Sequence, residues 1–154
     1  MIAVLQRVKK AAVTADGVPH DSCGAGFLIL LGVLDGDGER EAELLAEKIS
    51  KFRVFTDEND KMNLSLKDID GEALVVSNFT LGANYSHGNR PDFMASAHPS
   101  VAEPLYEYFV AQLRERVRYV GTGVFGADMT VDMIADGPVT VVMDSEKLKR
   151  RKTS

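Results

Sequence analysis

The chain carries apolar residues at helical spacing in two stretches. In the first, EREAELLAEKISKF (residues 39–52), the apolar side chains Ala42, Leu45, Ile49 and Phe52 follow at steps of three and four. The second, SVAEPLYEYFVAQLRERV (residues 100–117), repeats the spacing with Leu105, Phe109 and Leu113. Both patterns predict an amphipathic helix that packs one face on a core.

The start of the second helix is ambiguous. Ser100 and Glu103 have the spacing of a capping box, in which each side chain bonds the other residue's main-chain N–H. Pro104 would then stand where the first helical hydrogen bond belongs, and it has no N–H to donate. The helix therefore either begins later or has a distorted first turn.

Most of the remaining chain alternates apolar and polar residues or forms short β-branched runs, as strands do. The predicted strands are Ile2–Val8, Ala11–Ala15, Gly26–Leu34, Arg53–Thr56, Ala73–Leu81, Phe125–Ile134 and Val139–Met143. Two principal helices among many strands, without regular βαβ alternation, predict an α+β fold with a mainly antiparallel sheet. Several short strands separated by turns could curl this sheet toward a barrel.

The last two predicted strands are joined by Asp136, Gly137 and Pro138. Asp-Gly alone is typical of a two-residue hairpin turn. A proline directly after it stands where the returning strand would donate its first main-chain hydrogen bond, which proline cannot do. The pattern predicts a turn and leaves the reason for Pro138 open.

The composition is that of one soluble globular domain, with 154 residues, 45% of them hydrophobic and 27% charged. The longest apolar run lies within Gly24–Leu34 and is too short to span a bilayer, which takes about 20 residues. Nothing at the N-terminus resembles a signal peptide. Cys23 is the only cysteine, so we expect a cytoplasmic protein without a disulfide or a membrane partner.

A net charge of −5 argues against a protein that coats nucleic acid by charge alone. The charge is uneven, because KLKRRK (residues 147–152) is a basic run. We interpret residues 145–154 as a frayed, flexible basic tail behind a single domain at residues 1–144. A weak contact of this tail with phosphates is the alternative.

Two kinds of cofactor signal are weak. GTGVFG (residues 121–126) matches the dinucleotide-binding pattern, but we expect a helix before it and a strand after it, the reverse of what that pattern needs. Its glycines favour a bend, a bulge or the close approach of a flat ligand. His20, His87 and His98 have neither the spacing nor the neighbouring cysteines of a metal site. We therefore expect neither a metal nor another cofactor.

The segment VVSNFTL (residues 75–81) is a predicted strand with three polar residues. Ser77 and Thr80 would point to opposite faces of a regular strand, so both reach one pocket only if the strand ends or bulges there. An end at this place would free main-chain N–H groups around Phe79, which could stabilise a developing oxyanion. Ordinary strand polarity, with polar residues facing outward, explains the same pattern, and on periodicity alone we favour it.

Arg7 places a charge in the otherwise apolar first strand. Most such arginines extend outward along their aliphatic stem. A buried arginine would need acceptors, which carbonyl groups at a turn could supply.

Five segments together resemble the D-aminoacyl-tRNA deacylase family, which is also called the D-tyrosyl-tRNA deacylase family. In chain order they are MIAVLQRV, SNFTL, GNRPDF, TGVFGADM and DGPVT. The similarity extends from Met1 to about Val142, and Asn78 stands where the family usually has glutamine. The resemblance implies the family's fold and a homodimer. It also implies hydrolysis of the ester that joins a D-amino acid, or mischarged glycine, to the terminal adenosine of tRNA.

The resemblance assigns the chiral selection to the main chain. Gly137-Pro138 would have a cis peptide bond and project into the partner's active site. Its two carbonyls would receive the α-amino group of the substrate and leave no space for an L side chain. Arg7 would brace this turn by donating to its carbonyls.

The resemblance also implies the roles of the SNFTL and TGVFGADM residues. The N–H groups around Ser77 and Phe79 would hold the ester carbonyl, Thr80 would position substrate or water, and the 2′-hydroxyl of the tRNA would help to activate water. Substrate contacts are further implied for Asn78, Phe125, Gly126 and Met129, the last three beside the terminal adenine. Thr80 lacks a neighbouring base that would make it a covalent nucleophile.

Two alternatives remain open at this stage. The chain could be a non-catalytic RNA-binding module of the same fold. It could also be a related deacylase with a trans Gly-Pro bond and a looser chiral filter.

Overall fold

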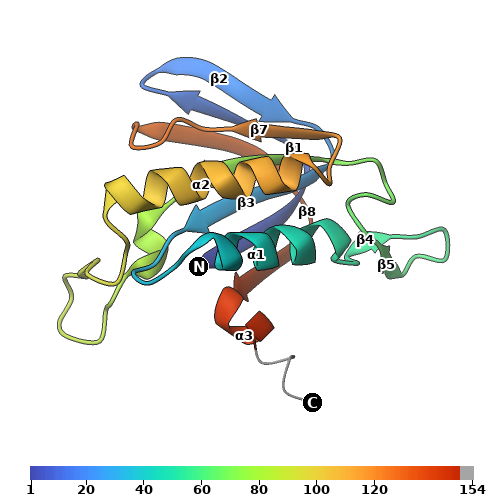
Figure 1. Ribbon diagram of the computed structural model, residues 1–154. Helices are drawn as coiled ribbons and strands as arrows, with labels where there is room; N and C mark the ends of the chain where they lie inside the picture. The colour runs from blue at the N-terminus through green and yellow to red at the C-terminus, as the bar shows by residue number, and fades with distance from the viewer. Residues whose placement is uncertain (150–154) are drawn as a thin grey trace.

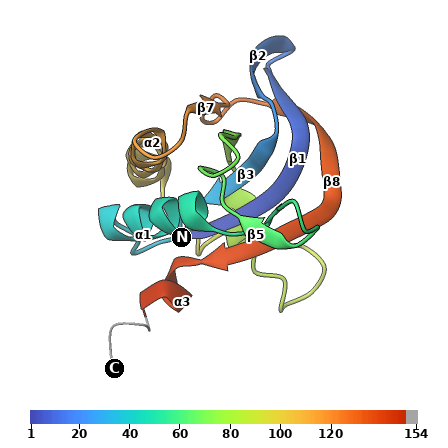
Figure 2. The same ribbon diagram turned by 90° about the vertical axis from the view of Figure 1, so that its right-hand side faces the viewer.

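The computed structural model describes residues 1–149, which form one strongly curved main sheet with two long helices on one side, and a separate two-stranded sheet of β4 and β5 (Figures 1 and 2). The strands are β1 (Ile2–Ala15), β2 (Val18–Cys23), β3 (Gly26–Gly32), β4 (Phe55–Thr56), β5 (Met62–Leu64), β6 (Glu72–Ser77), β7 (Tyr119–Thr122) and β8 (Met129–Asp144). The helices are α1 (Glu39–Lys51), η1 (Phe79–Gly82, a 3₁₀ helix), α2 (Pro99–Arg114) and α3 (Ser145–Lys149). None of those helices is long and apolar enough to cross a membrane.

The central strand of the sheet is β1, which pairs antiparallel with three others. Along one edge it pairs first with β3 and then with β2, and along its other edge with β8. The two strands predicted at Ile2–Val8 and Ala11–Ala15 are therefore one strand, because Lys10 still pairs with Ile134 of β8.

The rest of the main sheet is parallel. β3 pairs with β6, and β6 with β7, each through a crossover that contains α1 or α2. These two crossovers were not predicted, but most pairings are antiparallel, as expected. Asp21 of β2 accepts hydrogen bonds from Thr122 N–H (3.0 Å) and from the Tyr119 hydroxyl, which brings β2 beside β7. The sheet thus nearly closes, and the predicted barrel-like α+β fold is confirmed.

The two predicted helices are both present and bury the predicted faces. Leu45, Ile49, Phe109 and Leu113 are completely buried against one face of the sheet. The other face forms a smaller cluster with members on β1, β2, β3 and β6: Val8, Ala11, Val13, Cys23, Leu28, Leu74 and Val76. Leu28 and Val76 therefore face away from the helices, into the hollow of the curved sheet.

The helix starts differ from the predicted capping. α2 begins at Pro99, and the side chain of His98 accepts a hydrogen bond from Ser100 N–H at 3.1 Å, so the predicted Ser100–Glu103 box is wrong. Pro104 lies inside the helix on its exposed side, where solvent can satisfy the carbonyl that loses its partner. At α1 the N-cap is Gly38, whose N–H donates to the Glu41 carboxylate at 2.8 Å; this is the half of a capping box that a glycine N-cap allows.

Several predicted strand ends are wrong. The strand expected to run to Leu81 stops at Ser77, the one expected to run to Leu34 stops at Gly32, and the one expected to start at Phe125 starts at Met129. The short strands β2, β5 and β7 were not predicted. Their residues show no clear alternation of apolar and polar side chains, so local periodicity did not indicate strands at these places.

The predicted hairpin at Asp136–Pro138 is also wrong. β8 continues in one direction past this point, since Gln6 pairs with Thr140 and Val8 with Ala135. Arg7 alone therefore lies opposite the four residues 136–139, which form a bulge in an edge strand. An edge strand tolerates Pro138 because its outer side needs no donor, which answers the question raised by the sequence.

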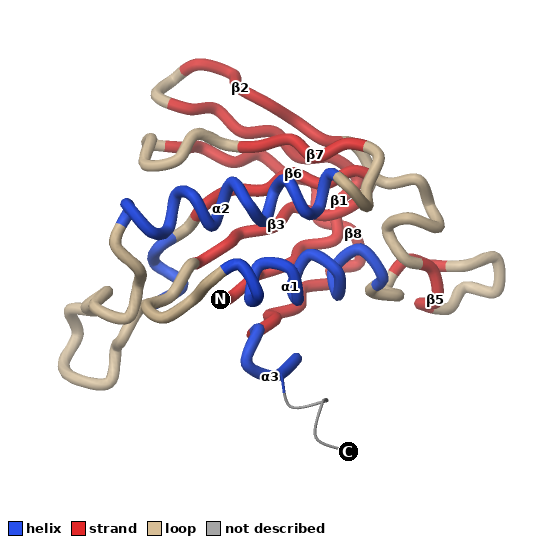
Figure 3. Tube along the Cα trace, in the orientation of Figure 1, coloured by secondary structure: helices blue, strands red, loops and turns tan. Residues whose placement is uncertain are grey.

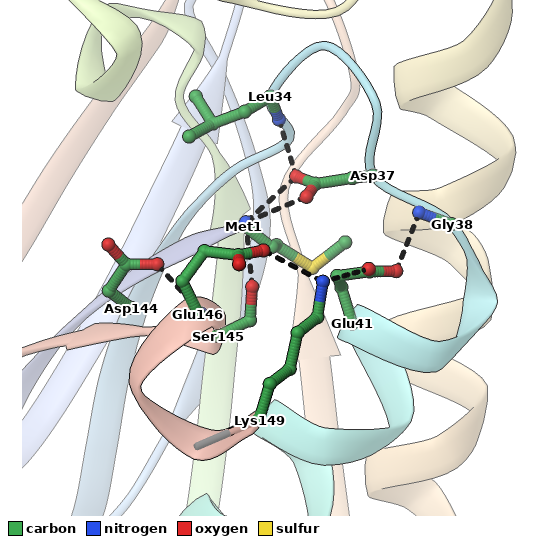
Figure 4. A network of polar contacts seen from close by, with 9 residues as sticks. All are labelled: Met1, Leu34, Asp37, Gly38, Glu41, Asp144, Ser145, Glu146 and Lys149. Atoms are coloured by element: carbon green, nitrogen blue, oxygen red, sulfur yellow. Dashed lines mark hydrogen bonds and ion pairs between the residues drawn. The ribbon is translucent and has the colours of Figure 1, made fainter.

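The C-terminal segment was predicted as a frayed tail, which is wrong for residues 145–149. They form α3, where Lys149 pairs with Glu41 (2.6 Å) and Glu146 (2.7 Å), as Figure 4 shows. The Ser145 hydroxyl and the Asp37 carboxylate both accept from the Met1 amino group, each at 2.9 Å. These contacts connect the segment to α1 and β1. Residues 150–154, with the rest of the basic run, lie outside the described residues.

Candidate active site

A cavity of about 1050 Å³ opens where β6 ends, between the hollow face of the sheet and the start of α2. Its walls are mostly apolar, with Leu28, Leu30 and Val76 from the sheet. The predicted residues of both motifs line it: Ser77, Asn78, Phe79, Thr80, Phe125, Gly126 and Met129. The structure thus brings together two segments that lie far apart in the chain.

The SNFTL motif is the place where β6 stops and η1 begins. Asn78 caps η1, because its side-chain oxygen accepts from Thr80 N–H at 3.3 Å and also from the Thr80 hydroxyl. The strand therefore ends here, and the ordinary strand polarity that periodicity favoured is wrong for this segment. Ser77 and Thr80 both line the cavity although a regular strand would separate them.

Two main-chain N–H groups are left without a neighbouring strand at this end. Asn78 N–H donates to the Leu31 carbonyl of β3 at 2.8 Å, so the Ser77 N–H points to the other edge of β6. On that edge β7 has already ended, since its last pair joins Val75 and Thr122. The Phe79 N–H is the first of η1 and has no partner within that helix. Donors of this kind beside a cavity can bind a carbonyl oxygen and stabilise negative charge on it.

The position of η1 depends on residues that the sequence pattern did not single out. The Ser96 hydroxyl donates to the Phe79 carbonyl at 2.6 Å, and Phe93 packs edge-to-face on Phe79 with ring centroids 5.2 Å apart. A Cβ at Gly82 would lie 2.3 Å from the Ser96 oxygen, so only glycine allows this approach. These contacts hold η1 against the segment that precedes α2.

Two further cavity residues were missed. His98 lines the cavity and caps α2 through its Nδ1, although we expected no role for it. Tyr106 lies deeper and donates its hydroxyl to the Val75 carbonyl at 2.7 Å. Burial raises the pKa of Tyr106 to about 12, so the phenol stays neutral at physiological pH. No signal in the sequence indicates that residues at the start of α2 line the cavity, because this depends on the helix starting beside the end of β6.

The segment TGVFGADM forms another wall, which starts beside the end of β6, where Gly123 N–H donates to the Val75 carbonyl at 3.1 Å. β7 runs into it, a turn follows, and no helix comes after it, so the dinucleotide pattern lacks the helix it needs. Phe125 packs on Tyr106 with centroids 6.0 Å apart. Gly126 has a positive φ of 78° and nothing within 4 Å of a would-be Cβ, which leaves open space beside Phe125. Met129 packs its sulfur over Gly123, where a Cβ would be 2.6 Å away.

Gly137 and Pro138 do not line this cavity, although they were predicted to bind substrate. Both are exposed, and the peptide bond between them is cis, in accord with the resemblance. Arg7 is 8% exposed and donates to the Asp136 carbonyl (3.2 Å) and the Val54 carbonyl (2.7 Å). It therefore contacts the bulge through the residue before Gly137, whereas the resemblance implied bonds to the carbonyls of Gly137 and Pro138.

The cavity contains few groups that could act as acid or base. Its titratable residues include His98 and Asp128 at the rim, and the Thr80 hydroxyl is bonded to Asn78 rather than to a base. Within residues 1–149, no three His, Cys, Asp or Glu side chains gather as metal ligands would. Main-chain donors and apolar walls are thus the main chemical resources of the site.

The fold and the site together define an α+β protein with an apolar cavity whose polar end is built from main-chain donors. Residues 4–144 match the family described as D-Tyr-tRNA(Tyr) deacylase. A D-aminoacyl-tRNA deacylase of Chloroflexus aurantiacus is 53% identical, over 97% of this chain and 93% of that protein. The chain belongs to the D-Tyr-tRNA(Tyr) deacylase family.

Two solved structures are similar to the fold. The c-Myc DNA Unwinding Element Binding Protein superposes with a TM-score of 0.88 at 40% identity, covering 94% of this chain and 98% of that one. A probable eukaryotic D-amino acid tRNA deacylase superposes with a TM-score of 0.81 at 16% identity, over 93% of this chain and 98% of that one. The predicted family and architecture are therefore confirmed.

Proposed function

We propose that the protein is a D-aminoacyl-tRNA deacylase, a hydrolase that cleaves the ester between a D-amino acid and tRNA. The observation that carries this proposal is the end of β6 at the cavity, where the N–H groups of Ser77 and Phe79 have no neighbouring strand. The family membership supports the same reaction. An ester carbonyl held by these donors would develop its negative charge where they can stabilise it.

The attacking group in this proposal is water. Thr80 has its hydroxyl bonded to Asn78, so it positions substrate or water and does not form a covalent intermediate. The 2′-hydroxyl of the terminal ribose assists in activating the water, which fits the scarcity of acids and bases in the cavity. The water oxygen bonds to the carbonyl carbon, and the ester C–O bond to the ribose then breaks to release amino acid and tRNA.

We assign the terminal adenosine of the tRNA to the cavity wall formed by TGVFGADM. Phe125 offers a ring for stacking, and the open space beside Gly126 allows a flat base to approach. Met129 contributes an adaptable apolar contact. The family resemblance of this segment supports the assignment.

We assign the selection of the D enantiomer to the bulge of a second copy of the chain. Gly137 and Pro138 are exposed and lie outside the cavity of their own chain. The side-chain bonds from Gln6 and Arg7 to the bulge end on the flanking carbonyls of Val139 and Asp136. The Gly137 and Pro138 carbonyls would thus be available to a substrate amino group in the partner's cavity.

A homodimer through the free edge of β8 would bring this about. β8 pairs only with β1 within the described residues, and its exposed apolar side chains include Met133, Ile134 and Val142. A long apolar edge strand calls for a covering partner.

Glycine esters have no side chain to exclude, so glycine mischarged on tRNA is a second substrate. The substrate implies that the protein works in the cytoplasm.

The test uses D-tyrosyl-tRNA and L-tyrosyl-tRNA with the purified protein. We expect release of D-tyrosine while the L ester survives, and equal hydrolysis of both would refute the chiral filter. Uncharged tRNA tests the other candidate, a non-catalytic nucleic-acid-binding module, to which the name of the c-Myc DNA Unwinding Element Binding Protein points. Tight, salt-sensitive binding without turnover of charged tRNA would favour that module.

A further inference from the structure

Exposed aromatic and apolar side chains lie on η1, which lines the cavity, and on the loop that follows it. Phe79, Tyr85 and Met94 are 62%, 82% and 86% exposed. Phe79 and Phe93 also line the cavity, so the exposed surface continues directly from its inner wall. The proposed chemistry uses the main chain of Phe79 and no other part of this surface.

The loop that follows η1 is built rather than loose. Asn84 and Asp92 exchange two main-chain hydrogen bonds of 2.8 and 3.0 Å, which close the loop at its base. The Asn84 side chain also accepts from Ser86 N–H and from the Ser86 hydroxyl, at 3.1 and 2.8 Å. The loop projects from the lower left of the molecule in Figure 3, at the end where α2 begins.

Two residues of this loop have no role in holding it together. Tyr85 stands next to the closing pair with its ring exposed, and Arg90 is exposed near the tip. Within residues 1–149, Arg90 takes part in none of the ion pairs. The loop that carries them leads into the cavity wall at Phe93. An exposed aromatic ring and an unpaired guanidinium are groups that bind single-stranded nucleic acid, by stacking and by contact with a phosphate.

We propose that Tyr85, Arg90 and Phe93 bind the unpaired nucleotides that precede the terminal adenosine of the substrate. This inference rests on the proposed function, because an adenosine ester in the cavity fixes where the preceding nucleotide must leave it. With a net charge of −5, the chain has little general attraction for RNA. Stacking on exposed rings does not depend on that charge, and one phosphate contact by Arg90 sets the direction of the strand.

The experiment compares D-tyrosyl esters of adenosine alone with those of a single-stranded tetranucleotide that ends in adenosine. Tyr85→Ala and Arg90→Gln should hydrolyse the adenosine ester as the unmodified protein does. With the tetranucleotide ester we expect kcat/KM to fall by about 5- to 100-fold for Tyr85→Ala, the usual range for one stacked base. Arg90→Gln should reduce the slope of log KM against log salt by about 0.7, the value for one phosphate of a single strand.

Matched controls lie at other parts of the surface. Val18→Ala shortens a side chain of comparable exposure (65%) on the β1–β2 hairpin, and Lys67→Gln removes one exposed positive charge from the turn before β6. Neither should distinguish the two esters. Anisotropy of a labelled, uncharged tetranucleotide measures binding without turnover and should weaken in Tyr85→Ala and Arg90→Gln alone.

Three results would overturn the inference. An equal fall of kcat/KM on both esters would show that Tyr85 and Arg90 support the reaction in the cavity and do not bind the preceding nucleotides. Unchanged kinetics and anisotropy would show that this loop does not bind RNA. Altered sedimentation of Tyr85→Ala would show that the loop is an interface between copies of the chain. Failure of the proposed function is seen separately, because the unmodified protein would then hydrolyse neither ester.

Discussion

The Nε of Arg7 donates to the main-chain oxygen of Asp136 across 3.2 Å, from the one β1 residue that lies opposite the bulge of β8. The same guanidinium donates from Nη1 to the Val54 carbonyl at 2.7 Å. A buried cation thus joins the bulge to the segment before β4. The shape of the Gly137-Pro138 corner depends on this side chain and not only on its own sequence.

Replacing Arg7 by methionine tests that dependence. Arg7→Met keeps the apolar stem but removes the charged donors, each worth about 1.5–3 kcal/mol, so the free energy of unfolding should fall by a few kcal/mol. The preference for D- over L-tyrosyl-tRNA should fall by about tenfold or more, corresponding to ~1.4 kcal/mol. Urea unfolding and single-turnover deacylation measure the two effects. Arg118→Met, at a half-exposed arginine far from the bulge, should retain the preference.

Thr80→Val separates a positioning hydroxyl from a nucleophile. Valine has the same shape but no hydroxyl, and the N–H groups of Ser77 and Phe79 remain. We expect activity to fall by about 10- to 100-fold, in line with one or two lost hydrogen bonds. Loss of all activity in a variant with an unchanged circular dichroism spectrum would assign the nucleophile to Thr80.

The close approach of Gly82 to Ser96 predicts a non-additive pair. Gly82→Ala should cost about 1–3 kcal/mol, because its Cβ would lie 2.3 Å from the Ser96 hydroxyl. Ser96→Ala should cost about 1 kcal/mol through the lost bond to the Phe79 carbonyl. The double variant should be less destabilised than the sum, which chemical denaturation of all four proteins would reveal. Strict additivity would contradict the packing of η1 described above.

The lowered pKa of Glu41 predicts that part of the free energy of unfolding is lost in acid. Burial by itself would raise its pKa, but hydrogen bonds from Lys149 and from Gly38 N–H outweigh burial and lower the pKa from 4.5 to about 2. A lowered pKa in the folded state stabilises the fold above pH 4.5, and this contribution is lost as the pH falls toward 2. Glu41→Gln should therefore show a shallower loss of the free energy of unfolding between pH 4.5 and 2.

The control for this prediction keeps the capping geometry. Glutamine can still accept from Gly38 N–H, so any change in the pH slope comes from the charge and its pairing with Lys149. Lys149→Met should flatten the same region of the profile. Identical slopes in all three proteins would mean that the contact in Figure 4 does not persist in solution.

Much of the fold could be predicted because the relevant signals are local. Leu45 and Ile49, or Phe109 and Leu113, recur at helical spacing, and both helices form with those faces buried. The end of β6 at Ser77 was not predicted, because the polar residues of SNFTL fit an ordinary strand with polar residues facing outward equally well. The capping of α2 was mispredicted because Ser100 and His98 are both near its start, and only the observed geometry distinguishes them.

What the sequence by itself determined is the set of amphipathic elements, the family, and the glycines and polar residues of its motifs. The tertiary structure alone decided how they combine. It turned a predicted hairpin into a bulge, because both halves of β8 pair with the same strand. It also brought Ser77 beside Phe125 in one cavity. The physical reason is that periodicity reports which face of an element is buried, whereas strand pairing is a contact between distant segments and leaves no local pattern.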